Sequence, residues 1–427
     1  MLSTVLPARR EARWILVGTL LSAVGRGLTL PFLYIYLTEV RGLAGGTAGL
    51  AVGWMGAVGL ALSLVGGTLI DRFGARRVLL PSWALLIAGS VCLALVQSAW
   101  QAFAVLTVFG VGNAAVWSGQ STVLATLTSE GERQRTFGLH FTMINLGIGV
   151  GGLISGVLVD VARPSTFQLI YLLDAASYLV PATILLAMPA VGGRIARPAP
   201  AAAHQIRGGY AQVLRHRPFR RLIVFALVLT TCGYAQIEVG FPAFATVAAQ
   251  VSPRVVGWAL AANAFTIVVA QLFVLRAIDG RSRTRILAVV CVIFACAWLV
   301  LGGAGLVADD NTLLASAGVI GCAWIFSLGE TLLSPVMPAL TNALATDELR
   351  GRYNAMNSVV FGLSGIIGPI SAGPLIGAGR GDVWVLLVVG GCLVASVLAL
   401  STRRLLTPAQ DGRTPPQHPA VPEPSAV

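Results

Sequence analysis

The sequence predicts an all-α polytopic membrane protein that crosses the bilayer twelve times. Of its 427 residues, 56% are hydrophobic and only 11% are charged, and its mean hydropathy is +0.82. An average soluble chain carries about 25% charged residues. A spanning helix needs about 20 apolar residues, so this length has room for about twelve helices and their loops. A transmembrane barrel would show short alternating segments, and a disordered chain would be far more polar.

Twelve long apolar runs, separated by charged and turn-forming residues, are the expected spans. The first run follows three arginines, but it is too long for the apolar region of a signal peptide. We therefore expect it to be retained as a span. The twelve predicted spans are residues 14–38, 47–70, 78–96, 101–127, 137–159, 167–188, 222–246, 255–277, 286–307, 312–343, 353–376 and 383–400.

The basic residues, all 29 of them arginines, are distributed very unevenly among the loops. If the spans alternate in direction, 24 arginines lie on the side of the N-terminus, four lie on the other side, and Arg26 lies within the first span. Cytoplasmic loops carry the excess of positive charge in membrane proteins. The sequence thus predicts a multi-pass protein of a bacterial-type inner cell membrane with both termini in the cytoplasm. The high pI reflects this topology and does not indicate a nucleic-acid partner.

Several kinds of chemistry lack the residues that they require. Without lysine, the chain has neither a phosphate-binding loop of the Gly-Lys-Ser/Thr type nor a Schiff-base lysine. The six cysteines lie within apolar runs and form no Cys-x-x-Cys pair, and a His-Glu-x-x-His motif is absent. We therefore expect no cofactor, no metal and no enzymatic activity.

Sequence patterns from the first half of the chain recur in the second half. Residues 67–77 (GTLIDRFGARR) correspond to residues 275–285 (LRAIDGRSRTR) at an offset of 208. Gly151-Gly152 in the fifth span corresponds to Gly368-Pro369 in the eleventh at an offset of 217, and the Arg-x-Arg pairs that begin at 133 and 350 share this offset. Patterns that recur in the same order indicate an internal duplication of a six-helix unit.

This duplication predicts two pseudo-symmetric six-helix bundles. A stretch rich in Pro, Ala, Gly and Arg separates them and has the composition of a linker. The proline-rich C-terminus is expected to be disordered. The predicted domains are a first bundle at 1–188, a cytoplasmic linker at 189–218, a second bundle at 219–405 and a disordered cytoplasmic tail at 406–427.

The loop after the second span resembles motif A, the cytoplasmic signature of the major facilitator superfamily. The matching residues are Gly67, Leu69, Asp71, Arg72, Gly74, Arg76 and Arg77. The nearest resemblance is to the drug:proton antiporter branch of bacterial multidrug efflux permeases. The chain departs from that branch at Gly152, where the antiporters carry proline, and at Leu106, where they carry arginine. The resemblance implies two six-helix bundles around a midplane cavity that opens alternately to each side.

We expect the motif to act as a gate between the bundles. Glycine allows close helix approach at position 67 and a tight bend at position 74. The Asp71 carboxylate can face a helix N-terminus or an arginine across the interface between the bundles, and so stabilise one closed conformation. The predicted gating residues are Gly67, Asp71, Arg72, Gly74, Arg76, Arg77 and Asp279. The small residues Gly151 and Gly152, with Gly368 and Pro369, are expected to form helix-packing or hinge positions.

Four charged residues lie inside the predicted spans and away from their ends, where each costs about 2.5–3.5 kcal/mol on insertion scales. Arg26, Glu238 and Glu330 lie in the first, seventh and tenth spans, which the resemblance places around the cavity together with the fourth span and its Asn113. The glutamates can exchange a proton for a cation, whereas Arg26 keeps its charge and can only bind an anion or balance a carboxylate. For Asp174, in the sixth span, we expect a structural hydrogen bond.

These features predict a secondary active transporter that works by alternating access, with proton-coupled efflux of small amphipathic compounds or drugs. Its expected partners are a small-molecule substrate, protons and the lipid bilayer, and it is expected to be a monomer. The alternatives are a uniporter or symporter of a small anionic metabolite bound by Arg26, a non-transporting membrane sensor, and an intramembrane protease. The protease would need Ser364, in a Gly-Leu-Ser-Gly turn, to pair with His140.

Overall fold

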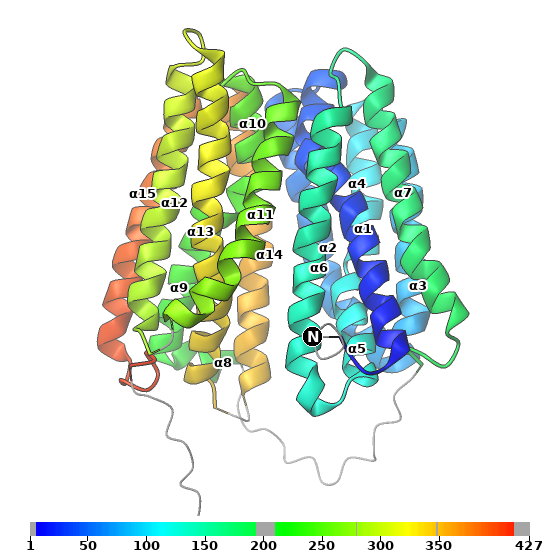
Figure 1. The fold of residues 1–427 in the computed structure, drawn as a ribbon, viewed down its shortest axis with the longest axis vertical. Coiled ribbons are helices and arrows are strands. Elements are labelled where there is room, and N and C mark those ends of the chain that lie inside the picture. Colours follow the sequence, from blue (N-terminus) through cyan, green and yellow to red (C-terminus); the bar gives the residue numbers. More distant parts are fainter. Residues whose placement is uncertain (1–5, 194–209, 279, 347–348, 414–427) are drawn as a thin grey trace, which may run out of the picture.

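The computed structural model describes residues 6–193, 210–278, 280–346 and 349–413. Its helices form two groups that stand side by side, the blue-to-cyan group from the first half of the chain and the green-to-red group from the second half (Figure 1). Twelve helical stretches among these residues are long and apolar enough to cross a membrane. The predicted all-α class and the predicted number of spans are confirmed.

Each group is built from helices that run between its two ends. The first half contains α1 (Arg10–Ile35), α2 (Gly45–Phe73), α3 (Ala75–Ala94), α4 (Ala99–Asn113), α5 (Val116–Leu127), α6 (Glu130–Leu158) and α7 (Pro164–Ala187). The second half contains α8 (Tyr210–Arg215), α9 (Arg217–Leu229), α10 (Gly240–Val247), α11 (Pro253–Ile278), α12 (Arg283–Leu306), α13 (Thr312–Leu344), α14 (Arg350–Gly377) and α15 (Gly381–Thr402).

Local sequence explains where several helices begin. Proline opens α7 and α11, where its missing N–H would have no helical partner. The side chains of Ser282 and Asn311 cap α12 and α13 by accepting hydrogen bonds from backbone N–H groups in the first turn. Gly74 separates α2 from α3 with φ at +88°, a conformation that favours glycine. The tight bend predicted at Gly74 is therefore present.

Two of the predicted spans are interrupted rather than continuous. The predicted span 101–127 consists of α4 and α5, which are separated by Ala114 and Ala115. The predicted span 222–246 consists of α9, the π-helical turn Thr230–Tyr234, the 3-10 turn Ala235–Ile237 and α10. Irregular backbone is tolerated at membrane depth where it is buried in protein or lines a cavity. These interruptions fall on the fourth and seventh spans, which are two of the expected cavity helices.

The two halves contact each other mainly through α2 with α14 and α6 with α11. Glycines bring the backbones together at both contacts. A Cβ on Gly49 would lie 2.6 Å from the Pro369 carbonyl oxygen, and a Cβ on Gly156 would lie 2.6 Å from the Gly257 Cα. Gly49 is near the start of α2 and Gly156 near the end of α6, so both contacts lie at the end of the molecule away from Gly74.

Toward the Gly74 end, the halves meet less closely. A Cβ added at Gly67, Gly138 or Gly365 would have no neighbour within 4 Å. Gly362 of α14 faces the side chain of Leu60 rather than backbone. In this conformation the halves are therefore packed tightly at one end and loosely at the other.

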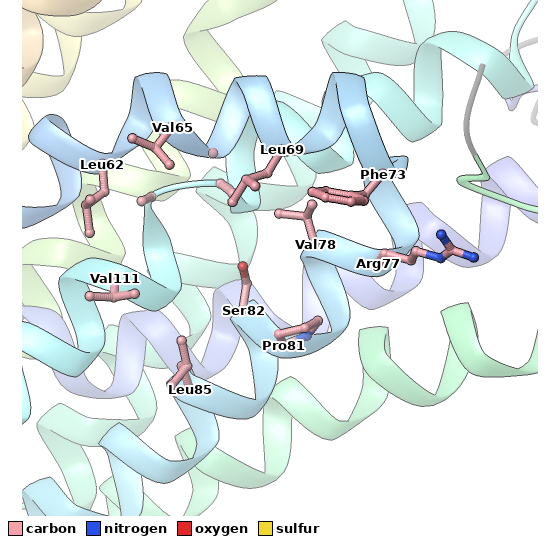
Figure 2. Close-up of a pocket in the computed structure, with 13 residues that line it drawn as sticks. Leu62, Val65, Leu69, Phe73, Arg77, Val78, Pro81, Ser82, Leu85 and Val111 are labelled. Atoms are coloured by element: carbon pink, nitrogen blue, oxygen red, sulfur yellow. The ribbon is translucent and has the colours of Figure 1, made fainter. Parts of the chain in front are cut away.

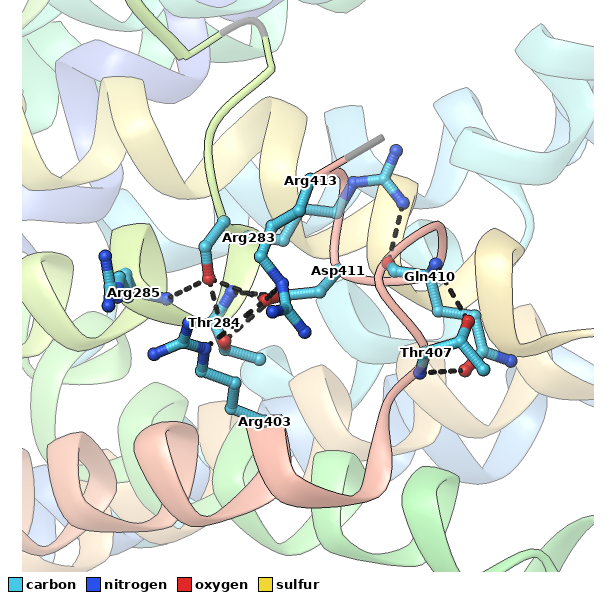
Figure 3. Close-up of polar contacts among 9 residues, drawn as sticks. Arg283, Thr284, Arg285, Arg403, Thr407, Gln410, Asp411 and Arg413 are labelled. Atoms are coloured by element: carbon cyan, nitrogen blue, oxygen red, sulfur yellow. Dashed lines mark hydrogen bonds and ion pairs between the residues drawn. The ribbon is translucent and has the colours of Figure 1, made fainter. Parts of the chain in front are cut away.

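After α15, the chain folds back onto the turn that precedes α12 (Figure 3). The carboxylate of Asp411 is fully buried there. Its Oδ1 accepts hydrogen bonds from the backbone N–H and the hydroxyl of Thr284, at 3.0 and 2.9 Å, and its Oδ2 accepts one from the Ser282 hydroxyl at 2.7 Å. The Nε atoms of Arg403 and Arg413 lie 3.8 and 2.9 Å from Oδ2. We call these contacts the C-terminal clasp.

The first half ends with a related arrangement. The Gly192 carbonyl accepts a hydrogen bond from the Arg76 N–H near the start of α3, and the Asp411 carbonyl accepts one from the Arg283 N–H at the start of α12, both at 2.8 Å. The turns contain Gly192 at φ +74° and Gly412 at φ +75°. The predicted disordered tail is therefore wrong for residues 406–413, which are ordered by these contacts, and residues 414–427 lie outside the described residues.

Replacing Asp411 by alanine is expected to release the C-terminal clasp. The change leaves the Ser282 and Thr284 donors without their acceptor and two arginines without their counter-charge, at a cost of about 2 kcal/mol. Amide hydrogen exchange across residues 403–413 should become roughly thirtyfold faster. The exposed Asp310 provides the control, and equal exchange in the Asp411→Ala and Asp310→Ala variants would contradict the prediction.

His216, which precedes α9, gives the second half a pH-dependent contact. Its Nδ1 lies 2.9 Å from the Tyr353 hydroxyl, and burial lowers the pKa of His216 below its usual 6.5. His216 therefore binds a proton more readily when its contact with Tyr353 is broken than when it is made. The contact weakens as pH falls below about 6.5. Exchange of α8 amides should rise between pH 7 and pH 5, and His216→Gln should remove this pH dependence.

Candidate functional site

Glu330 occupies the middle of α13 and is half-buried. Its Oε1 accepts a hydrogen bond from the Tyr234 hydroxyl at 3.0 Å. The side chain of Asn263 on α11 also lies close to this carboxylate. Glu330 is thus held by groups from the seventh and eighth spans of its own half, and Tyr234 belongs to the π-helical turn that interrupts the seventh span.

Arg26 connects charges of the two halves. It is half-buried on α1 and lies within electrostatic range of Glu238 in the second half and of Asp174 in its own half. Glu238 is exposed and follows the 3-10 turn that leads to α10. The structure therefore brings Arg26 and Glu238 into one region, whereas Glu330 is engaged by Tyr234.

Asp174 makes the structural hydrogen bond expected for it. The side chain is fully buried on α7. Its Oδ2 accepts hydrogen bonds from the Ser90 hydroxyl at 2.8 Å and, more weakly, from the Thr29 hydroxyl at 3.4 Å. These contacts tie α7 to α3 and α1.

Asn113 is the last residue of α4, directly before the interruption of the fourth span. Its side chain is exposed. Two residues along a helix are about 200° apart, so Asn113 lies on nearly the opposite side of α4 from Val111, which faces α2 and α3. A role for Asn113 in the cavity stays a prediction.

The motif spans the last turns of α2 and the first turn of α3, and Gly67 does not make the contact expected of it. Gly67 has open space around it, so the close approach predicted there is wrong for this conformation. Its neighbour Gly66 makes that approach instead, since a Cβ on Gly66 would lie 2.8 Å from the Ala115 Cβ. Asp71 and Arg72 are exposed at the last turn of α2, and the Arg72 guanidinium lies 5.2 Å from the centre of the Phe73 ring.

Arg76 joins α3 to the end of α7 within the first half. Its guanidinium donates to the carbonyl oxygens of Leu185, Leu186 and Met188, the last at 2.9 Å. A guanidinium at a helix C-terminus satisfies carbonyls that have no helical partner. Arg77 is exposed and lies next to Phe73 (Figure 2). Asp279, the predicted equivalent of Asp71, lies outside the described residues.

The paired small residues of the fifth and eleventh spans divide their contacts in the same way. Gly151 packs against α1 of its own half, where a Cβ would lie 2.7 Å from the Leu28 nitrogen, and Gly368 packs against Ala235 of its own half. Their neighbours face the other half. Gly152 lies opposite Leu260 of α11, and the Pro369 carbonyl lies opposite Gly49 of α2.

The residues needed by the protease alternative have other partners. The Ser364 hydroxyl is hydrogen-bonded to those of Thr230 and Thr231, at 2.6 and 2.9 Å. His140 is buried in the other half, with its ring centre 5.5 Å from that of Trp117. Among the described residues there is also no cluster of three side chains that could hold a metal ion.

Asn263 is the site residue that sequence reasoning missed. It is a single amide in the apolar run of α11, and its Nδ2 also donates to the Ala323 carbonyl at 3.4 Å. An uncharged polar residue gives a weaker signal than a charge, because interhelical hydrogen bonds commonly involve such residues without transport. Asn263 is visible as a polar residue in the apolar run 255–277, but nothing in the sequence connects Asn263 with Glu330.

Comparison with known proteins identifies the family. The family model described as Major Facilitator Superfamily matches residues 15–250 and 235–426. The Multidrug resistance protein MdtH of Aeromonas hydrophila subsp. hydrophila is 29% identical, over 92% of this chain and 95% of that protein. An uncharacterized MFS-type transporter, YqjV of Bacillus subtilis, is 25% identical over 92% of this chain and 93% of its own length.

Solved structures share the fold. The crystal structure of a POT family transporter in complex with 5-aminolevulinic acid superimposes with a TM-score of 0.76 at 15% identity, covering 95% of this chain and 99% of that chain. Another, of the peptide transporter POT in complex with sulfate, gives a TM-score of 0.74 at 15% identity over 94% and 97% of the two chains. With motif, fold and family model in agreement, this multi-pass membrane protein belongs to the major facilitator superfamily and is a secondary transporter rather than an enzyme.

Proposed function

We propose that the protein exports small amphipathic compounds or drugs from the cell in exchange for protons. The Gly74 end, where most of the arginines of the described loops lie, faces the cytoplasm on this proposal. The conformation described above is then closed toward the outside and looser toward the cytoplasm. That is the state in which an exporter takes up its substrate.

The hydrogen bond between Tyr234 and Glu330 is the observation that carries the proposal. A carboxylate in a membrane interior is costly unless it has a function or a partner. A phenol partner is neutral and leaves the carboxylate free to gain or lose a proton, whereas an arginine partner would hold it ionised. Because Tyr234 sits in an irregular turn of the seventh span, movement of that turn can make or break the bond as access alternates.

Arg26 and Glu238 have a second role in the proposal. They belong to different halves, so the Coulomb energy between them changes when the halves move relative to each other. A cationic substrate that approaches Glu238 competes with Arg26 for the carboxylate. Substrate binding can therefore weaken an attraction between the halves and favour the movement.

Known relatives support efflux as the direction of transport. Several proteins that match most of this chain at 23–29% identity carry the name Multidrug resistance protein MdtH. The Aeromonas salmonicida protein, at 27% identity, is one of them. Drug export by this chain is inferred from that similarity together with its embedded carboxylates.

The test is dye and drug accumulation in a bacterial host that lacks its own efflux pumps. Cells that express the protein should accumulate less of a cationic amphiphile than cells with empty vector. A protonophore should abolish the difference. No difference across a broad panel of cationic, neutral and anionic compounds, with the protein verified in the membrane, would refute multidrug export.

A carrier of a small anionic metabolite is the second candidate, and Arg26 is the observation that favours it. A guanidinium keeps its charge and can bind a carboxylate or phosphate in two-point fashion. This candidate requires Arg26→Gln to abolish transport while Glu330→Gln merely slows it. The exporter of cations requires the reverse.

A further inference from the structure

An apolar groove lies on the first half, away from the interface between the halves. We call it the α2–α3 groove. Its volume is about 480 Å³, and its walls include Leu62, Leu69 and Phe73 of α2 and Val78 and Leu85 of α3. Figure 2 shows Arg77 at one end, next to Phe73, and Leu62 at the other end.

The groove opens sideways from spanning helices, so its occupant comes from the bilayer. Val65 and Phe73 on its rim are 50% and 40% exposed. The walls belong to α2 and α3, whose predicted spans are residues 47–70 and 78–96, and we take this apolar surface to face lipid rather than water. The floor is formed by the interruption between α4 and α5, where Ala114 and Ala115 lie.

The length of the groove matches one leaflet of a bilayer. From Phe73 to Leu62, α2 rises about 16 Å, and from Arg77 to Leu85, α3 rises about 12 Å. Half of the hydrocarbon core is about 15 Å thick. Since Arg77 is close to the Gly74 turn, where the predicted spans of α2 and α3 end, the groove runs from headgroup level to about the bilayer midplane. A lipid acyl chain has this direction and this length.

Arg77 is the charged residue that lines the polar end of the groove. Arg77 is exposed and makes no hydrogen bond or ion pair within the part of the chain that the structure describes. Arg72 lies across the Gly74 turn and contacts the Phe73 ring. Arg76, in contrast, is engaged by the carbonyls at the end of α7. The Arg77 guanidinium, with Arg72 across the turn, complements a phosphate, which guanidinium groups bind well.

We propose that the α2–α3 groove binds an anionic phospholipid, with one acyl chain in the groove and the phosphate at Arg77. Bound lipid fills the space behind the α4–α5 interruption. Gly66 and Ala115 already touch there, so the lipid supports the packing of α5 against α2. The lipid is a ligand of this face and is separate from the substrate that moves between the halves.

The test is native mass spectrometry of the purified full-length protein after equilibration with mixed micelles of phosphatidylglycerol and phosphatidylcholine. The wild type should retain phosphatidylglycerol in preference. Arg77→Gln should reduce this preference about fivefold, the effect of one arginine near a lipid headgroup. Arg404→Gln, which removes an exposed arginine at the end of α15, should leave the preference unchanged.

Two further arms separate the groove from simple charge attraction. Leu69→Trp places bulk in the groove and should lower retention of both lipids, with the unfolding temperature checked to show that the variant is folded. An excess of glycerol phosphate, which has the headgroup chemistry without acyl chains, should not displace the lipid. Equal preference in the wild type and Arg77→Gln, equal loss in Arg404→Gln, or displacement by glycerol phosphate would each overturn the proposal. None of these readouts depends on transport.

Discussion

Replacing Glu330 by glutamine is expected to reduce proton-driven export to the level of cells with empty vector. Glutamine keeps the size of the side chain and can still hydrogen-bond to Tyr234, but it cannot release a proton. Without that step, the proton gradient no longer drives the return of the empty transporter. The measurement is accumulation of a fluorescent cationic dye at matched expression, with Glu238→Gln measured in parallel.

Exchange of substrate separates loss of coupling from loss of folding. In liposomes with equal substrate concentrations on both sides, labelled substrate exchanges without net proton movement, so Glu330→Gln should retain this activity. Tyr234→Phe removes a hydrogen bond to a carboxylate, worth about 1.5–3 kcal/mol, and should slow export by roughly tenfold or more without abolishing it. Normal proton-driven export by Glu330→Gln would rule out Glu330 as the coupling residue.

The second large effect is expected at Gly151. A Cβ there would collide with the Val24 carbonyl oxygen and lie 2.7 Å from the Leu28 nitrogen, both backbone atoms of α1 that cannot rotate away. Alanine at this position should therefore push α1 and α6 apart and lower the free energy of unfolding by about 1–3 kcal/mol. Thermal unfolding of the detergent-purified protein should show a midpoint several degrees lower.

The neighbouring glycine provides a matched control for this prediction. A Cβ on Gly152 would lie 3.3 Å from the Leu260 Cβ, so α11 has to move by only a few tenths of an ångström to accommodate it. Gly152→Ala should therefore lower the unfolding midpoint much less than Gly151→Ala, because no backbone atom blocks the added methyl group. Equal destabilisation by the two substitutions would show that crowding against the α1 backbone is not the cause of the lower unfolding midpoint of Gly151→Ala.

Composition and charge were sufficient to predict the architecture, because membrane spans require long apolar runs whatever their neighbours are. The bend at Gly74 was also predictable, since few other residues adopt its backbone conformation. The interruption at Ala114 and Ala115 was not. No proline or glycine stands at those two positions, and their close contact with Gly66 of α2 is visible only in the folded structure.

The parts of the site that depend on distant partners were not accessible from sequence. Glu330 stood out as a charge in an apolar run, but its contact with Tyr234 joins residues 96 positions apart. The sequence places Arg76 in a predicted gate, whereas its partners in the structure are backbone carbonyls of α7, which no pattern of side chains reveals. Asp411 was hidden for a similar reason, because its buried state depends on Ser282 and Thr284 far upstream.

The returning segments at Gly192 and Asp411 also bear on how the chain could be divided. Each of them completes the half that precedes it, because its carbonyl binds an N–H group near the start of that half's third span. A gene split between codons 194 and 209 would leave both segments with their own polypeptides. Two such fragments, when co-expressed, should each fold as a complete half and together restore the transporter. A split directly after α7 would remove the turn at Gly192 from the first fragment.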